Sequence, residues 1–266
     1  MRSFSRLIAG IAVCVLGVTP GGFAQTDANA AESARFRVGP VRFTPSLSLT
    51  NIGIDSNVFN EFGNERRDTT AAAGPAVDYW LKLGRARLNG KSAGQYLYFR
   101  QYDNQRAWNT ANDLRLEIPL ARVTPFVTGS RSNTKNRPGF EIDSRARLRS
   151  TAVSGGANVR LSGKTDLVVS GMRQTFSFDD EESFLGAELS QFLNRRSDTG
   201  AVHLRTKLTP LTTFVVRGEA TQDRFDAATE RDTDSYAVLP GFELRPAALI
   251  SGQVFVGVRR FATRSD

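Results

Sequence analysis

The sequence predicts an all-β protein, an antiparallel up-and-down transmembrane β-barrel. Three observations lead to this fold class. Apolar and polar residues alternate with period two through most of the chain after residue 40, as in strands with one apolar and one polar face. The alternating segments are longer than the usual strand of a soluble protein and suit a tilted crossing of a bilayer. Short turns and longer polar loops alternate between them, which is typical of membrane barrels.

The composition excludes several classes of protein. The chain has 266 residues, with 35 Lys+Arg, 27 Asp+Glu, one Cys and one His. A single Cys and a single His argue against a disulfide framework, a Cys-rich metal site and a His-pair mechanism. We therefore expect no catalytic residue, no metal and no cofactor. The formal net charge of +8 allows an anionic partner, but no basic stripe with interleaved aromatics indicates nucleic acid.

Residues 1–30 have the layout of a cleaved signal peptide. Two arginines precede an apolar run at residues 7–18, and this run is too short to span a bilayer as a helix. Small residues permit cleavage after Ala24 or after Ala30, and the sequence does not choose between them. We expect residues 31–40 to be a short periplasmic segment ahead of the barrel.

About 11 strands are expected in the remaining chain. Their approximate ranges are 41–54, 70–82, 86–102, 110–120, 122–130, 147–161, 165–178, 198–208, 212–223, 234–245 and 249–262. Every second connection is long, and these polar loops fill residues 55–69, 103–109, 131–146, 179–197 and 224–233. A soluble β-sandwich has no reason to collect its long loops at one end, whereas a membrane barrel has short periplasmic turns and long extracellular loops.

An odd number of strands departs from the even number that single-chain bacterial barrels normally have. The last four residues, Thr263-Arg264-Ser265-Asp266, are polar and lack a terminal aromatic residue. The expectation is that residues 41–266 form a barrel of 12 or more strands when complete, and that this chain lacks the closing strand or strands.

The charged face of each strand should point into the lumen, because an ionised group facing hydrocarbon is not solvated. Basic residues outnumber acidic ones on this face, which favours a weak anion preference; alternatively, cross-strand pairs simply fill a narrow lumen. The lumen-lining candidates are Asp78, Lys82, Arg87, Lys91, Arg115, Glu117, Arg205, Lys207, Arg217, Glu219, Asp223, Glu243, Arg245 and Arg259. Candidates for aromatic girdles at the membrane interfaces are Tyr79, Tyr96, Tyr98, Phe176, Phe214, Tyr236 and Phe242.

Two further polar clusters lie near strand ends. The acidic run Asp179-Asp180-Glu181-Glu182 could bind calcium, but a solvated loop neutralised by Arg195 and Arg196 is the better interpretation. Arg145, Arg147 and Arg149 would share one strand face, where they would suit phosphate or sugar-acid groups or form a solvated strand top.

His203, the single histidine of the chain, could serve as a general base in a hydrolase. No Gly-x-Ser-x-Gly elbow or comparable motif accompanies it, so an outer-membrane hydrolase is only a minor alternative.

Three segments carry a resemblance to a known family. Val41–Leu49, Gly53–Phe59 and Arg137–Arg145 resemble strand and loop segments of the porin-like outer-membrane β-barrel family of Gram-negative bacteria. The resemblance implies a place in the cell outer membrane and passage or export of polar solutes or polysaccharide. It implies no catalytic residue.

Two other hypotheses remain open. One is a structural or surface-interaction barrel with a plugged lumen and partner-binding extracellular loops. The other is that the chain is a secreted soluble β protein and not a membrane barrel. For the membrane barrel, the expected partners are outer-membrane lipid and lipopolysaccharide, the barrel-assembly machinery, and polar solutes or polysaccharide. The sequence does not give the oligomeric state.

Overall fold

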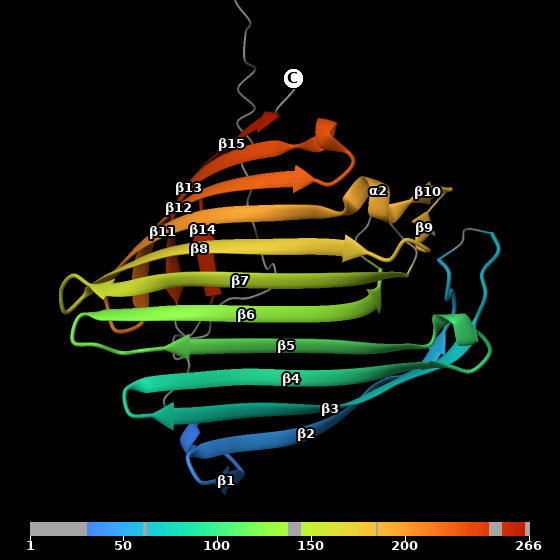
Figure 1. Cartoon of the computed structure of the whole chain (residues 1–266), viewed down its shortest axis with the longest axis horizontal. Coiled ribbons are helices and arrows are strands. Elements are labelled where there is room, and N and C mark those ends of the chain that lie inside the picture. The colour runs from blue at the N-terminus through green and yellow to red at the C-terminus, as the bar shows by residue number, and fades with distance from the viewer. Residues whose placement is uncertain (1–30, 61–62, 138–144, 185, 245–251, 264–266) are drawn as a thin grey trace, which may run out of the picture.

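The computed structural model describes residues 31–60, 63–137, 145–184, 186–244 and 252–263. These residues form one 13-stranded antiparallel sheet and a separate two-stranded hairpin (Figure 1). The expected signal peptide and Arg245 lie outside the described residues. No described helix is long and apolar enough to cross a membrane.

The sheet is a meander in which each strand pairs with the next long strand of the chain. Its strands are β1 (Phe36–Val38), β2 (Val41–Asp55), β3 (Asp68–Leu83), β4 (Ala86–Phe99), β5 (Ala107–Glu117), β6 (Val123–Asn136), β7 (Ala146–Arg160), β8 (Thr165–Phe178), β11 (Arg195–Lys207), β12 (Thr212–Phe225), β13 (Thr233–Leu244), β14 (Gly252–Phe255) and β15 (Val258–Thr263). The loops carry β9 (Ser183–Phe184), β10 (Ala187–Glu188), α2 (Leu189–Leu193) and the 3-10 turns η1 (Asp103–Gln105) and η2 (Thr229–Arg231).

β14 and β15 are two pieces of one strand. Both pair with β13 in a single register, which joins Phe242 to Val254 and Val238 to Val258. Between the two pieces, the backbone N–H of Val256 donates to the carbonyl of Pro240 at 3.0 Å. With β14 and β15 taken together, the long strands of the described chain follow the series that the sequence predicts, and the all-β antiparallel fold is confirmed.

Some strand boundaries differ from those expected. β6 continues to Asn136, beyond the expected end at residue 130. Its last residues are polar on both faces, so the hydropathy alternation disappears there while the backbone pairing with β7 continues. Residues 36–38 form β1, which pairs with β2 through a turn at Gly39, where φ is +57°.

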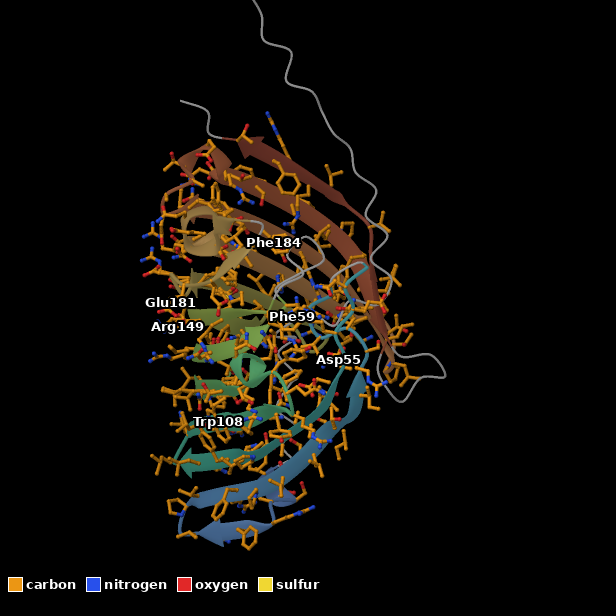
Figure 2. The ribbon with its side chains drawn as sticks, turned by 90° about the vertical axis from the view of Figure 1, so that its right-hand side faces the viewer. Asp55, Phe59, Trp108, Arg149, Glu181 and Phe184 are labelled. Carbon is orange, nitrogen blue, oxygen red and sulfur yellow. The ribbon has the colours of Figure 1, made fainter. Side chains whose placement is uncertain are left out.

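In a soluble protein, a sheet packs its apolar face inward and exposes its polar face. In this sheet the concave face is polar and the exposed outer face is apolar. Cross-strand partners share a face, and the register places the buried strand residues, such as Phe126, Ser154 and Val215, on the polar face. The other face exposes large apolar side chains, such as Leu47 (80%) and Val238 (58%). We call the buried, polar face the inner face and the apolar one the outer face. The inner face lines the hollow of the curved sheet, where Asp55 and Phe59 lie, while Arg149 lies on the opposite side (Figure 2).

Curvature toward the inner face brings neighbouring backbones close together. A Cβ added to Gly156 would collide with the carbonyl oxygen of Val169 and would lie 2.9 Å from the ring of Phe126. A Cβ on the adjacent Gly155 would meet only the carbonyl oxygen of Phe126, at 3.9 Å. Glycine at position 156 thus permits the close approach of β7 and β8. Within the described residues, the edges at β1–β2 and β14–β15 do not pair with each other.

Candidate functional site

The inner face is the candidate site, because the charged strand residues gather there. The described lumen-lining candidates all lie on it by register. They are Asp78 and Lys82 on β3; Arg87 and Lys91 on β4; Arg115 and Glu117 on β5; Arg205 and Lys207 on β11; Arg217, Glu219 and Asp223 on β12; Glu243 on β13; and Arg259 on β15. Alternation places these side chains together, since pairing partners share a face.

The carboxyl-terminal strands carry a network of paired charges. The carboxylate of Glu243 accepts hydrogen bonds from Arg205 and, at 3.0 Å, from Arg217. The guanidinium of Arg217 also donates to Gln253 at 3.0 Å and lies 3.9 Å from the ring centroid of Phe255. Glu219 pairs with Arg259 at 3.3 Å. These partly exposed side chains are held in place by one another, so the wall presents fixed charges.

The amino-terminal strands form a second charged sector. Lys91 lies opposite Asp78 on one side and Asp113 on the other in the strand register. Arg115 pairs with Glu117 at 3.3 Å and stacks 4.4 Å above the ring of Phe126. Asp113 is not among the expected lumen-lining residues, although its alternation with Arg115 is a signal that identifies it.

β6, β7 and β8 separate the two charged sectors with a hydroxyl-rich sector, which is uncharged except for Arg160 and Asp166 at its turn end. The hydroxyls of Thr128 and Ser154 are hydrogen-bonded at 2.6 Å, and the amide of Gln174 donates to Ser150 at 3.0 Å. All four side chains lie on the inner face by register. The inner wall therefore alternates between charged and uncharged polar surfaces.

The loop between β2 and β3 contacts the inner face of the sheet at the end where the long loops lie. A bulge between Thr50 and Gly53, with Asn51 at φ +52°, shifts the register by one residue and turns Asp55 inward. Arg145 pairs with Asp55 at 3.2 Å. The side chain of Arg137 donates to the carbonyls of Asn57 and Val58, at 3.3 and 3.0 Å, and Val58 is fully buried.

A second loop segment, which contains β9, β10 and α2, packs near the loop ends of β7 and β8. Leu189 of α2 forms a buried cluster with Ala146 and Phe178, two residues that belong to the inner face. The carboxylate of Glu182 accepts a hydrogen bond from the backbone N–H of Arg147 at 3.0 Å. This segment and the loop at Val58 thus both pack at the loop end of the inner face.

Asp68, at the loop end of β3, anchors the following hairpin. Its buried carboxylate accepts hydrogen bonds from the backbone N–H groups of Thr69, Gln101 and Tyr102 at 2.7, 2.9 and 3.1 Å. Desolvation by burial raises the pKa of Asp68. The backbone hydrogen bonds together lower the pKa by a larger amount, so it lies below its ordinary value.

The expected girdle aromatics fall on the outer face with one exception. Tyr79, Tyr96, Tyr98, Phe214, Tyr236 and Phe242 point outward by register. Phe176 lies on the inner face, opposite Arg195, whose guanidinium is 4.3 Å from the ring centroid. Its position near a strand end suggested a girdle, but the parity of β8 directs it inward.

The two clusters near strand ends are arranged differently from the expectation. Arg147 and Arg149 point outward from β7, whereas Arg145 precedes the strand and pairs with Asp55. Asp179 is paired with Arg149 at 2.9 Å and lies 3.9 Å from Arg147. Arg195 and Arg196, expected to neutralise the acidic run, instead contact Phe176 and Asp198. In the described part of the chain, no group of His, Cys, Asp and Glu could hold a metal ion.

His203 lies on the inner face among charged residues. Its cross-strand partner is Arg217, and its Nε2 is 4.0 Å from Glu219. Within the described residues, no hydroxyl side chain is hydrogen-bonded to this imidazole.

The family comparison agrees with this geometry. The family model described as "Putative beta-barrel porin 2" matches residues 31–265. The chain belongs to this family. Membership agrees with the resemblance of the three segments named above, and a β-barrel porin accounts for the polar inner face and the apolar outer face together. A search against curated protein sequences found no match.

Proposed function

We propose that this porin-family chain resides in the outer membrane and forms a passive channel or export conduit for polar solutes or polysaccharide. One observation carries the proposal: the described strands gather their charged and polar side chains on the inner face of the curved sheet and expose large apolar side chains on its outer face. In water this arrangement would leave large apolar surfaces solvated, whereas in a bilayer it encloses a hydrated lumen.

The length of the uncharged outer surface, taken along the strands, supports a membrane location. Outward side chains are uncharged over residues 200–208, 212–220 and 236–244 of three adjacent strands. Each stretch is about nine residues long, close to the ~9–11 residues with which a tilted strand crosses the hydrocarbon layer. We call this stretch the apolar band. Charged outward residues begin immediately beyond it, at Asp198 and Asp234.

The proposed mechanism is sieving by width and by fixed charge. Glu243 and Glu219 hold the arginines of the carboxyl-terminal sector against the wall. Basic residues outnumber acidic ones among the lumen-lining candidates, which supports a weak preference for anions. The loop at Val58 and the segment at Leu189 would set the width at the loop end.

Single-channel recording tests the proposal. The chain, expressed with its own amino terminus, is purified from outer membranes and checked for a heat-dependent shift in gel mobility. It is then added to a planar bilayer. We expect discrete conductance steps with a reversal potential displaced toward that of the anion. A folded, heat-shifting protein without steps would contradict the channel.

The two inward loop segments favour one rival function, a plugged barrel whose loops bind a partner. Weakening the tie between Arg145 and Asp55 separates the two functions. In a channel, the Arg145→Gln variant should change the size of existing conductance steps. In a plugged barrel, neither the wild-type protein nor the variant should conduct.

A further inference from the structure

An arginine cluster lies on the outer face just beyond the apolar band. Thr151 of β7 and Thr175 of β8 are cross-strand partners, and Arg131 and Arg196 flank them in the same row. Arg149 lies two residues from Thr151 toward the loops, and Arg173 lies two residues from Thr175 toward the turns. These four arginines, which we call the arginine frame, therefore surround a pair of hydroxyl groups.

The frame is open to the surroundings of the barrel. The side chains of Arg149, Arg173 and Arg196 are 54%, 64% and 49% exposed, and Arg131 is also exposed. They lie on the face opposite to the lumen, so they are not part of the proposed conduction path.

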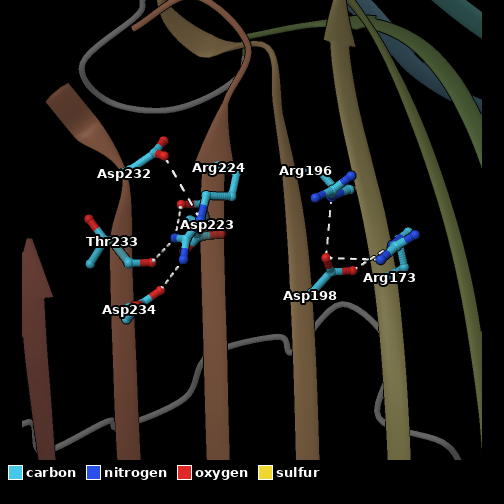
Figure 3. Close-up of polar contacts among 8 residues, drawn as sticks. All are labelled: Arg173, Arg196, Asp198, Asp223, Arg224, Asp232, Thr233 and Asp234. Atoms are coloured by element: carbon cyan, nitrogen blue, oxygen red, sulfur yellow. Dashed lines mark hydrogen bonds and ion pairs between the residues drawn. The ribbon is translucent and has the colours of Figure 1, made fainter. Parts of the chain in front are cut away.

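Nearby carboxylates neutralise the frame only in part. Asp198 accepts two hydrogen bonds from Arg173, at 2.6 and 3.2 Å, and pairs with Arg196 at 3.2 Å (Figure 3). Asp179 pairs with Arg149 at 2.9 Å. No ion pair of Arg131 occurs in the part of the chain that the structure describes. Excess positive charge remains on this patch, which suits an anionic ligand.

The level of the arginine frame along the strands indicates which kind of anion it would meet. Gly200 is the last outward residue of the apolar band on β11, and Asp198 and Arg196 follow it toward the long loops. In a membrane barrel the long loops are extracellular, so the frame would lie at the headgroup level of the outer leaflet. A guanidinium group can donate two parallel hydrogen bonds to two oxygens of one phosphate, and the threonine hydroxyls add further donors.

A shallow groove adjoins the frame on the side of the apolar band. It has a volume of about 710 Å³ and is lined by Val153, Gly171, Gly200 and Ala220, with Arg173 and Asp198 at its polar end. An acyl chain could lie against these small residues while its charged headgroup reaches the arginines. We propose that the arginine frame binds the phosphates of lipid A, the phosphorylated glycolipid portion of lipopolysaccharide. The proposal rests on the outer-membrane location given under the proposed function.

Lipid A titration of the purified full chain in detergent tests the proposal. The readout is the temperature at which the folded gel form is lost, measured with bisphosphorylated lipid A and with the same lipid after removal of its phosphates. Ligand binding to the folded state raises this temperature. The test variant is Arg131→Gln/Arg149→Gln. The control is Arg85→Gln/Arg122→Gln, which removes the same charge from exposed residues of two turns.

We expect phosphorylated lipid A to stabilise the wild-type protein and the control at the same concentration. The test variant should need about tenfold more lipid, since each lost charge-assisted hydrogen bond weakens binding substantially. The dephosphorylated lipid should stabilise none of them to the same extent. Equal titrations of all three proteins, or equal protection by both lipids, would overturn the proposal.

Two further measurements keep the outcomes distinct. If the double variant does not fold, the single Arg131→Gln variant takes its place, because Arg131 is exposed and its loss should leave the sheet intact. Conductance is recorded on the same preparations. Steps without phosphate-dependent stabilisation would refute the lipid site alone, and stabilisation without steps would refute the channel alone.

Discussion

The guanidinium of Arg145 lies 3.2 Å from the carboxylate of Asp55, a residue ninety positions earlier in the chain. The pair joins the loop end of β2 to the beginning of β7, and both side chains are more than two-thirds buried, with exposures of 16% and 28%. Arg145 also stacks 4.3 Å above the ring of Phe99. This contact holds the loop that contains Val58 at the inner side of the sheet.

Breaking this pair should destabilise the loop end of the barrel. Asp55→Asn and Arg145→Gln should each cost about 1–3 kcal/mol, as expected for a part-buried hydrogen bond to a charged group. The double variant should cost little more than either single variant, because the two residues act through one contact. Unfolding of the purified protein in detergent measures the cycle. Additive costs would contradict the coupling, and Asp103→Asn, which breaks an exposed local pair, is the control.

Gly156 and Gly155 form a matched pair for testing the curvature of the sheet. Gly156→Ala should destabilise the folded form by about 1–3 kcal/mol, because the added methyl group overpacks the contact with Val169 and Phe126. Gly155→Ala should be close to neutral. The fraction of heat-shifting protein after a temperature series gives both values, and equal effects would argue against close strand approach at position 156.

Asp68 predicts a dependence of stability on pH. Because its folded-state pKa lies below the ordinary value, its stabilising contribution is present above the ordinary pKa, which is about 3.9. The contribution is lost as the pH falls through the folded-state pKa. Asp68→Asn should therefore cost about 1–3 kcal/mol at neutral pH, with the difference from wild type shrinking below about pH 4.

Unfolding in detergent from pH 7 down to pH 2 measures this difference. Asp226→Asn removes an exposed carboxylate of the β12–β13 loop and is the control. A cost for Asp68→Asn that does not change with pH would show that the ionised carboxylate is not the stabilising form.

Leu204→Arg separates a membrane barrel from a soluble sheet. Leu204 is exposed on the outer face near the middle of the apolar band. In a bilayer the substitution should cost about 2–4 kcal/mol, whereas in a soluble protein a charged residue at an exposed site is nearly neutral. Refolding into lipid vesicles measures the cost. Ala201→Arg, on the inner face, should be tolerated much better, and the opposite order would contradict the assignment of the faces.

Glu243→Gln should make the channel more selective for anions. The substitution removes the carboxylate shared by Arg205 and Arg217, so that two positive charges of the wall lose their counter-charge. We expect the ratio of chloride to potassium permeability to rise about twofold, as measured from the reversal potential across a salt gradient. Glu230→Gln, in the exposed turn η2, should leave the ratio unchanged. A fall in anion preference after Glu243→Gln would contradict a conducting wall at this position.

Period-two alternation was sufficient to predict the strand series and the shared face of distant residues such as Asp78 and Arg259. The prediction was less successful where the alternation stops. The pattern predicts a loop where the polar last residues of β6 lie, and it groups Arg145 with Arg147 although Arg145 lies outside the strand.

The loop contacts could not be read from the sequence. The bulge after Thr50 reverses the face of Asp55, and no local pattern indicates that Arg145 is its partner. The packing of Leu189 against Ala146 and Phe178 likewise joins segments whose proximity depends on how the loops fold. Long-range contacts of this kind are set by the tertiary arrangement and leave no periodic signal.

The hydroxyl-rich sector formed by β6, β7 and β8 lies between the two charged sectors of the inner wall. Ions would be held near the charged flanks, where Glu243 and Lys91 lie. A hydroxylated neutral molecule could instead move along Thr128, Ser154 and Gln174, exchanging one hydrogen-bond partner for the next without displacing a counter-ion. If the chain forms the proposed channel, sugars and salts would follow separate routes along its wall.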